Sequence, residues 1–295
     1  MNRRAFLCSA IALAERAARL KASVDTRSQS LATEGWRLFE ITTHVHVQNA
    51  SGVTRAWLPT PLVGAPYQQT LGDTYQAEGG RVVMVESEEL DLLYAEWPPG
   101  VDPILTLTSR IATRDYVVDL AVPRVPPPPD LSGFSRDLRP LKPASTDIDA
   151  MHLTGTDAER ARQLFDRTTA SIAHDASGAD AHRQYVAYAR AAGIPAHPVY
   201  GLGLASPAAT AAQQCRAEVY LTGFGWVPVD LGARTFGAWR APWTGFNSAQ
   251  DVALPKSSGR PLPYFMHPQA ETANGRADSL DAGSFRYEIA VREAT

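Results

Sequence analysis

The sequence has few cysteines, little net charge and no long apolar run. Only Cys8 and Cys215 occur among 295 residues, which excludes a disulfide scaffold and a cysteine-rich zinc or iron–sulfur site. The formal net charge of −3 is close to neutral and does not provide the positive charge that binding to nucleic acid or to an anionic membrane requires. No apolar stretch reaches the roughly 18 residues that a membrane-spanning helix needs. We therefore expect neither a nucleic-acid partner nor an integral membrane segment.

Apolar residues, proline and glycine are abundant instead. The chain is 44% hydrophobic and 20% charged, a composition typical of a globular protein with a sizeable core. It carries 22 prolines and 21 glycines, which favour many short strands and loops over a helical bundle. The length suits one large domain or two modest ones.

The first 34 residues carry a pattern that resembles a targeting signal. Arg3 and Arg4 directly precede the apolar stretch Phe6–Ala14, and this arrangement resembles a twin-arginine export signal. The stretch is short, and Glu15 and Arg16 follow it at once. The pattern predicts export to the periplasm. An amphipathic N-terminal helix on a cytoplasmic protein is the alternative.

Residues 35–122 predict an all-β domain that resembles a sandwich. Trp36–Val47 alternates polar and apolar residues, with Ile41, Thr43, Val45 and Val47 on one face. Turn signals separate further short runs of strand-forming residues, a spacing typical of antiparallel sandwiches. These runs are Thr54–Leu58, Arg81–Glu86, Asp91–Trp97, Ile104–Ile111 and Tyr116–Val122. Residues 123–153 form the expected linker, because the prolines of Pro123–Asp130 exclude a helix.

Residues 154–240 predict a mixed α+β core. Thr156 and Glu159 form a capping box for a first helix. A second helix is expected over Ala179–Ala192, with Gly193 as its C-terminal glycine and a proline stop after it. Strands are expected at His197–Leu204, Arg216–Thr222 and Trp226–Asp230. Residues 241–295 form a C-terminal extension that closes with a strand over Phe285–Val291.

Two stretches of this core, taken together, resemble the transglutaminase-like superfamily. They are ARAAGIP at residues 189–195 and CRAEVYLTGFGWVPVD at residues 215–230. The resemblance implies a papain-like fold in which a helix packs on an antiparallel sheet. It also implies a catalytic cysteine at the start of that helix, a histidine on the next strand and an aspartate at the end of the following one. A thiol at a helix N-terminus has a lowered pKa, the histidine moves its proton, and the aspartate orients the histidine.

Counting along the motifs shows that two of these three groups are replaced. With Gly193-Ile194-Pro195 as the anchor, the cysteine position falls on Gly178 and the histidine position on Gln214. Glycine has no nucleophile, and an amide does not titrate as a general base. Only Asp230 keeps the residue type of the family. The loop from Ile172 to Gly178 is also shorter than the family usually has. The comparison predicts a degenerate, catalytically silent member of the family.

Other groups near these positions could replace the lost ones. Cys215 and Ser177 are the alternative nucleophiles. Neighbouring side chains on a strand point to opposite faces, so if Gln214 faces the cleft, Cys215 should face away from it. His174 and His182 flank the lost cysteine position, and His44 and His46 share one strand face. None of these histidines has the spacing of a firm metal site. No metal and no organic cofactor is expected, because phosphate-binding glycine loops are absent from the sequence.

Each remaining feature also has a structural interpretation. Asp230 suits a turn after a strand, and Asp180 suits the first turn of a helix. Gln214 could be a satisfied polar group on a half-buried strand. Tyr220, Phe224 and Trp226 form an aromatic set that is expected to pack the core.

Three functions are compatible with these residues. The first is a pseudoenzyme that acts as a binding or scaffold module for a peptide or protein ligand. The second is an active amide hydrolase or acyl transferase of the cysteine or serine type that uses relocated residues. The third is a decaying gene product without a selected function, which poor expression would support.

Overall fold

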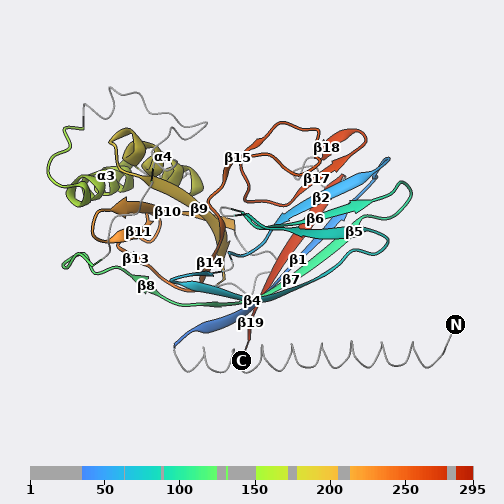
Figure 1. Cartoon of the computed structure of the whole chain (residues 1–295), viewed down its shortest axis with the longest axis horizontal. Coiled ribbons are helices and arrows are strands. Elements are labelled where there is room, and N and C mark those ends of the chain that lie inside the picture. Colours follow the sequence, from blue (N-terminus) through green and yellow to red (C-terminus); the bar gives the residue numbers. More distant parts are fainter. Residues whose placement is uncertain are drawn as a thin grey trace.

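The computed structural model describes residues 35–62, 64–87, 90–124, 131, 151–171, 178–204, 213–277 and 284–294. It confirms an α+β fold with a β-rich N-terminal region. Two bodies lie side by side in Figure 1: a β-sandwich, and a core in which two helices cover a sheet. Within the described ranges, no helix is long and apolar enough to cross a bilayer. The export pattern of residues 1–34 and most of the predicted linker lie outside these ranges.

The sandwich consists of two five-stranded antiparallel sheets. The first has the order β19-β1-β7-β4-β3 and the second the order β18-β17-β2-β6-β5. The strands of the first sheet are β1 Arg37–Val47, β3 Gly64–Ala65, β4 Gln68–Gln76, β7 Ile104–Thr113 and β19 Phe285–Ala294. Those of the second are β2 Thr54–Pro59, β5 Arg81–Val85, β6 Leu92–Trp97, β17 Gln269–Thr272 and β18 Gly275–Ala277.

Apolar residues from both sheets fill the space between them. The predicted face of β1 is confirmed, because Ile41, Thr43, Val45 and Val47 are all buried. Val45 and Val47 belong to one cluster with Leu58 and Trp97 from the second sheet. Burial of these alternating residues fixes the register of each strand, since a slip of one residue would turn every apolar side chain to solvent.

The C-terminal strands are part of the sandwich. Strand β19 pairs with β1 over its whole length, from Leu38 opposite Ala294 to Val47 opposite Phe285. Strand β17 pairs with β2 in the other sheet. Residues 241–295 were expected as an extension, and the pairing shows that their last strands complete both sheets that the N-terminal residues begin.

The core contains a five-stranded antiparallel sheet with the order β12-β11-β10-β9-β14. Its strands are β9 Ala196–Gly203, β10 Gln213–Leu221, β11 Gly225–Asp230, β12 Thr235–Phe236 and β14 Trp243–Asn247. The three central strands match the sequence prediction within a few residues. Two small two-stranded sheets complete the described strands: β8 Tyr116–Val117 with β13 Ala238–Trp239, and β15 Gln250–Val252 with β16 Leu262–Tyr264.

Two helices cover one face of this sheet, as Figure 1 shows. Helix α3 spans Asp157–Ser171, and its capping box is confirmed: the Thr156 N–H donates to Glu159 at 2.7 Å and the Glu159 N–H donates to Thr156 Oγ1 at 3.3 Å. Helix α4 spans Gly178–Ala191. It ends as predicted, because Gly193 has a φ of 79° and the Ile194 N–H donates to the Ala189 carbonyl at 2.9 Å.

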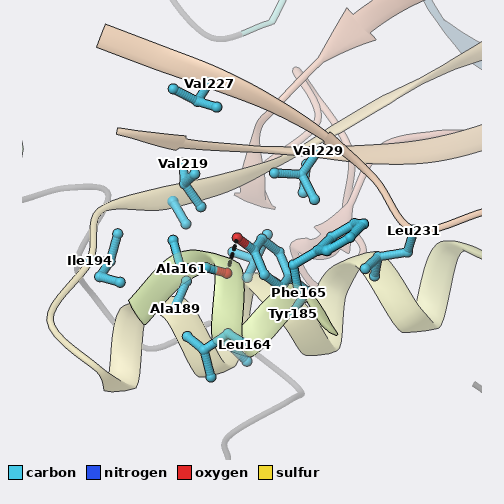
Figure 2. Packing of buried hydrophobic residues seen from close by; sticks show 14 of the residues in the cluster. Ala161, Leu164, Phe165, Tyr185, Ala189, Ile194, Val219, Val227, Val229 and Leu231 are labelled. Carbon is cyan, nitrogen blue, oxygen red and sulfur yellow. Dashed lines mark hydrogen bonds between the residues drawn. The ribbon is translucent and has the colours of Figure 1, made fainter. Parts of the chain in front are cut away.

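The helices and the sheet share one apolar interior. Tyr185 from α4 points toward Val219 and Val229 of the sheet in Figure 2. Leu164 from α3 belongs to the same cluster, and all four residues are fully buried. The Tyr185 hydroxyl donates to the Ala161 carbonyl at 3.3 Å, which satisfies the polar end of a buried aromatic ring. This interior packs helix α4 against strands β10 and β11.

The sequence analysis misplaced the end of one strand and missed several others, of which β4 is the longest. The strand expected over Tyr116–Val122 ends at Val117, because the Asp119 carboxylate accepts the Ala121 N–H at 2.9 Å and turns the chain. Strand β4 was missed entirely. Its sequence QQTLGDTYQ has few apolar residues and no alternation, since most of the strand is partly or fully exposed.

Candidate functional site

A polar cavity of about 460 Å³ lies where the first turns of α4 face strands β10 and β11. The helix contributes His182, and the beginning of β10 contributes the four residues from Gln213 to Arg216. Asp230, at the end of β11, and the turn after it form the remaining wall. The cavity therefore brings together Gln214 and Asp230, two of the three positions that the sequence singled out.

The third position, Gly178, is the first residue of α4. The family pattern requires its nucleophile at a helix N-terminus, and the structure begins a helix at this residue. The unpaired N–H groups and the positive dipole end of the helix would lower the pKa of a thiol there. Asp180, in the same turn, forms an ion pair with Arg183 three residues later, which fits its predicted role as a favourable charge at the helix start.

Gln214 leans toward the neighbouring strand β9. A Cβ atom added to Gly203 would lie only 2.7 Å from the Gln214 Nε2 atom, so the amide lies close over the glycine backbone. Strand β9 borders β10 on one side and β11 borders it on the other. Gln214 is exposed and leans away from the strand that carries Asp230.

The Asp230 carboxylate is buried and both of its oxygens have partners. Oδ1 accepts the Ala233 N–H at 2.9 Å, and Oδ2 lies 3.0 Å from the Arg216 Nε atom. Burial by itself raises the pKa of Asp230, but the neighbouring donors and positive charge lower it to about 2. His182 Nε2 is 3.7 Å from Oδ1, beyond hydrogen-bonding distance. We therefore assign most of the lowering to Arg216 and to the Ala233 N–H.

Sequence reasoning missed Arg216, which is buried beside this carboxylate. Its guanidinium carbon lies 4.7 Å from the centre of the Trp243 ring, and Nη1 and Nη2 each donate to the Arg240 carbonyl at 3.3 Å. Burial lowers the pKa of Arg216, yet a guanidinium stays protonated in proteins. The charged residues Arg216 and Glu218 inside the run CRAEVYL were the available signal, since an inward-facing charge on a strand needs a buried partner.

The Nε2 atom of His182 already accepts a hydrogen bond. The Leu231 backbone N–H donates to Nε2 at 2.9 Å, so this nitrogen is the unprotonated one of a neutral ring. A neutral imidazole has a single lone pair that can accept a proton. In this arrangement His182 holds the turn after Asp230 and is unable to act as a general base without breaking that hydrogen bond.

Cys215 also borders this cavity, but its side chain is buried whereas that of the neighbouring Gln214 is exposed, as expected for adjacent residues on a strand. Its thiol is buried and packs with Tyr200 and Met266. Burial raises the pKa of Cys215 well above its usual value, and this effect outweighs the nearby Arg183. The prediction that Cys215 behaves as a small buried apolar residue agrees with this environment.

The other candidates lie apart from the cavity or outside the described residues. His44 and His46 are on β1 of the sandwich, where they bond to Thr106 and Asp102. Tyr220 and Trp226 form the predicted cross-strand pair, with ring centres 5.6 Å apart. No group of three potential metal ligands forms among the residues that the structure describes. Cys8, His174 and Ser177 fall outside them.

The helix-on-sheet core has the α+β arrangement of a papain-like fold. Comparison with family models makes this specific: residues 174–231 match the transglutaminase-like superfamily. This stretch of the core is therefore transglutaminase-like, as the sequence resemblance indicated.

One curated protein and one solved structure are similar to this chain. An uncharacterized protein of Haemophilus influenzae is 31% identical over a region that covers 39% of this chain and 42% of that protein. The chain thus matches less than half of its relative's length. A crystal structure from Cytophaga hutchinsonii, provisionally described as a cysteine protease, aligns with a TM-score of 0.54 at 12% identity, covering 88% of this chain and 89% of that one. This second likeness concerns the fold alone.

Proposed function

We propose that the transglutaminase-like domain is a catalytically inactive pseudoenzyme that acts as a binding or scaffold module for a peptide or protein ligand. The observation that carries this proposal is the cavity itself. It lies beside the first turns of α4 and is lined by Gln214 and Asp230. The family motif assigns the thiol and the imidazole to positions 178 and 214, where this chain has glycine and glutamine. A binding surface can survive the loss of both reacting groups.

The alternative of an active enzyme with relocated residues needs a nucleophile and a base in contact. Cys215 borders the cavity together with His182, which is the one observation that favours it. Two features speak against it. The raised pKa of the Cys215 thiol keeps it protonated, and the His182 lone pair already accepts the Leu231 N–H. A thiol is a poor nucleophile when it is neither ionised nor paired with a free base.

The proposal predicts that the purified wild-type chain is inert toward amides. Incubation with glutamine-containing peptides is expected to release no ammonia above the buffer background, with or without iodoacetamide. The same peptides are expected to shift the His182 ring and Leu231 amide NMR signals, because His182 lines the cavity and the Leu231 N–H donates to its ring. Iodoacetamide-sensitive ammonia release would contradict inactivity. Unshifted signals would contradict peptide binding at this cavity. Cys215→Ser is the matched control for any thiol-dependent signal.

We further propose that the chain is exported through the twin-arginine pattern at Arg3 and Arg4. Expressed at full length in a bacterium with a periplasm, the wild type is expected in the periplasmic fraction. The Arg3→Lys/Arg4→Lys variant is expected in the cytoplasm, because it removes the paired guanidinium groups while keeping the charge. Equal distribution of both proteins between the fractions would refute this assignment.

A further inference from the structure

Asp230 is the one triad position that keeps its residue type, and each of its carboxylate oxygens already has a partner. In a working triad, the carboxylate accepts the second ring N–H of the histidine and so holds that ring in the useful orientation. Here Oδ2 forms an ion pair with Arg216, whose Nε atom is 3.0 Å away, and Oδ1 accepts the Ala233 N–H at 2.9 Å. No hydrogen bond between Gln214 and Asp230 occurs in the described part of the chain, and Gln214 leans toward Gly203 instead.

Arg216 is held firmly in this position. Its stem and guanidinium are about nine-tenths buried, the charge lies over the Trp243 ring, and the Arg240 carbonyl accepts two of its N–H groups. Swinging away from Asp230 would leave a charge buried without its partner, which is strongly unfavourable. Arg216 also follows Gln214 by two residues on β10, so both side chains leave the strand on the same face.

We infer that Arg216 is a positioning residue that keeps the Asp230 carboxylate away from any base at position 214. This inference rests on the proposed function and deepens it: the cleft is inert for three reasons instead of two. Restoring a thiol and an imidazole would leave the imidazole without its carboxylate. Recovery of a coupled triad requires a change at position 216 as well.

The test compares three variants of the full chain. The double variant carries Gly178→Cys and Gln214→His. The release variant adds Arg216→Met, because methionine is unbranched, packs against the indole of Trp243 and has no charge to bind Asp230. The matched control adds Arg216→Lys, which keeps a cation beside the carboxylate. Alkylation of the thiol at position 178 by iodoacetamide is followed by mass spectrometry, and titration of the imidazole at position 214 is followed by NMR.

The release variant is expected to differ from the other two in both readouts. At pH 6 its thiol should be alkylated about 10-fold faster than in the double variant or the lysine control, because an imidazole oriented by a carboxylate stabilises the thiolate. The imidazole should titrate about one pH unit higher, because a carboxylate at hydrogen-bonding distance favours the charged ring. Equal rates and equal titration midpoints in all three variants would overturn the inference.

A further measurement keeps the inference testable if the release variant does not fold. Adding Asp230→Asn to the double variant, in which Arg216 is intact, should leave the titration midpoint of the imidazole unchanged. A fall of about one pH unit would show that the carboxylate already reaches position 214, and this would also overturn the inference. Neither result bears on the wild-type chain, whose inactivity is judged by ammonia release from glutamine peptides.

Discussion

Asp230→Ala should destabilise the protein by about 3–5 kcal/mol, because removing one member of a buried ion pair leaves the other charge unpaired. The side chains of Asp230 and Arg216 are each only 10% exposed, so water replaces little of the lost interaction. The change also removes the acceptor of the Ala233 N–H. Urea unfolding at pH 7, followed by tryptophan fluorescence, measures the loss. A decrease below about 1 kcal/mol, typical of an exposed pair, would show that the pair is not buried in solution.

A double-mutant cycle provides the control. Arg216→Met alone should destabilise the protein because Asp230 is then left as the unpaired charge. Combining Arg216→Met with Asp230→Asn should recover part of the loss, since neither buried charge remains. Simple additivity of the two single losses would mean that the residues do not interact.

The same pair should make the protein sensitive to acid. The pKa of Asp230 is lowered to about 2 in the folded state, from an ordinary value of 3.8. A lowered folded-state pKa contributes stability above the ordinary value, and this contribution is lost as the pH falls from about 4 toward 2. The double variant Arg216→Met/Asp230→Asn should therefore lose less stability over this interval than the wild type. Glu96, whose pKa is also about 2 because Tyr94 and Arg55 donate to it, keeps part of the dependence in both proteins.

Phe285→Ala should cost about 3–5 kcal/mol, the usual effect of removing a phenyl ring from a packed interior. Phe285 begins β19, is 1% exposed and packs with Val45 and Leu58 between the two sheets. The ring therefore joins the C-terminal strand to the N-terminal sandwich. Urea unfolding measures the change.

Glu288→Ala is the matched control for this prediction. Glu288 is exposed on the same strand, opposite His44, and its replacement should change the unfolding free energy by no more than about 0.5 kcal/mol. Similar small effects of both substitutions would mean that β19 does not pack against the sandwich.

The sequence predicted those elements whose signals are local. Both helices were found because a capping box and a C-terminal glycine mark their ends, and β1 was found because its apolar residues alternate. The helix start at Gly178 followed from the family motif. Strand β4 escaped prediction since its polar, partly exposed residues carry no alternation.

Long-range pairing could not be predicted in the same way. The residues of β17 and β19 carry no signal of their pairing partners. Strand β17 pairs with β2 and β19 pairs with β1, and both partners lie near the other end of the chain. The importance of Arg216 was hidden for a related reason. A charge inside an apolar strand signals a buried partner, but only the meeting of β10 and β11 shows that this partner is Asp230. The remaining triad position thus looked intact in sequence although its carboxylate is occupied.

The pairing of β19 with β1 has a consequence for biosynthesis. The ribosome delivers the whole helix-on-sheet core, through Asn247 at the end of β14, before it delivers β17 and β19. The core can therefore acquire its contacts early, whereas the sandwich waits for its last two sheet neighbours with the outer edges of β1 and β2 uncovered. Uncovered strand edges invite pairing with other chains, so the nascent protein should be most prone to aggregation just before its final strands leave the exit tunnel.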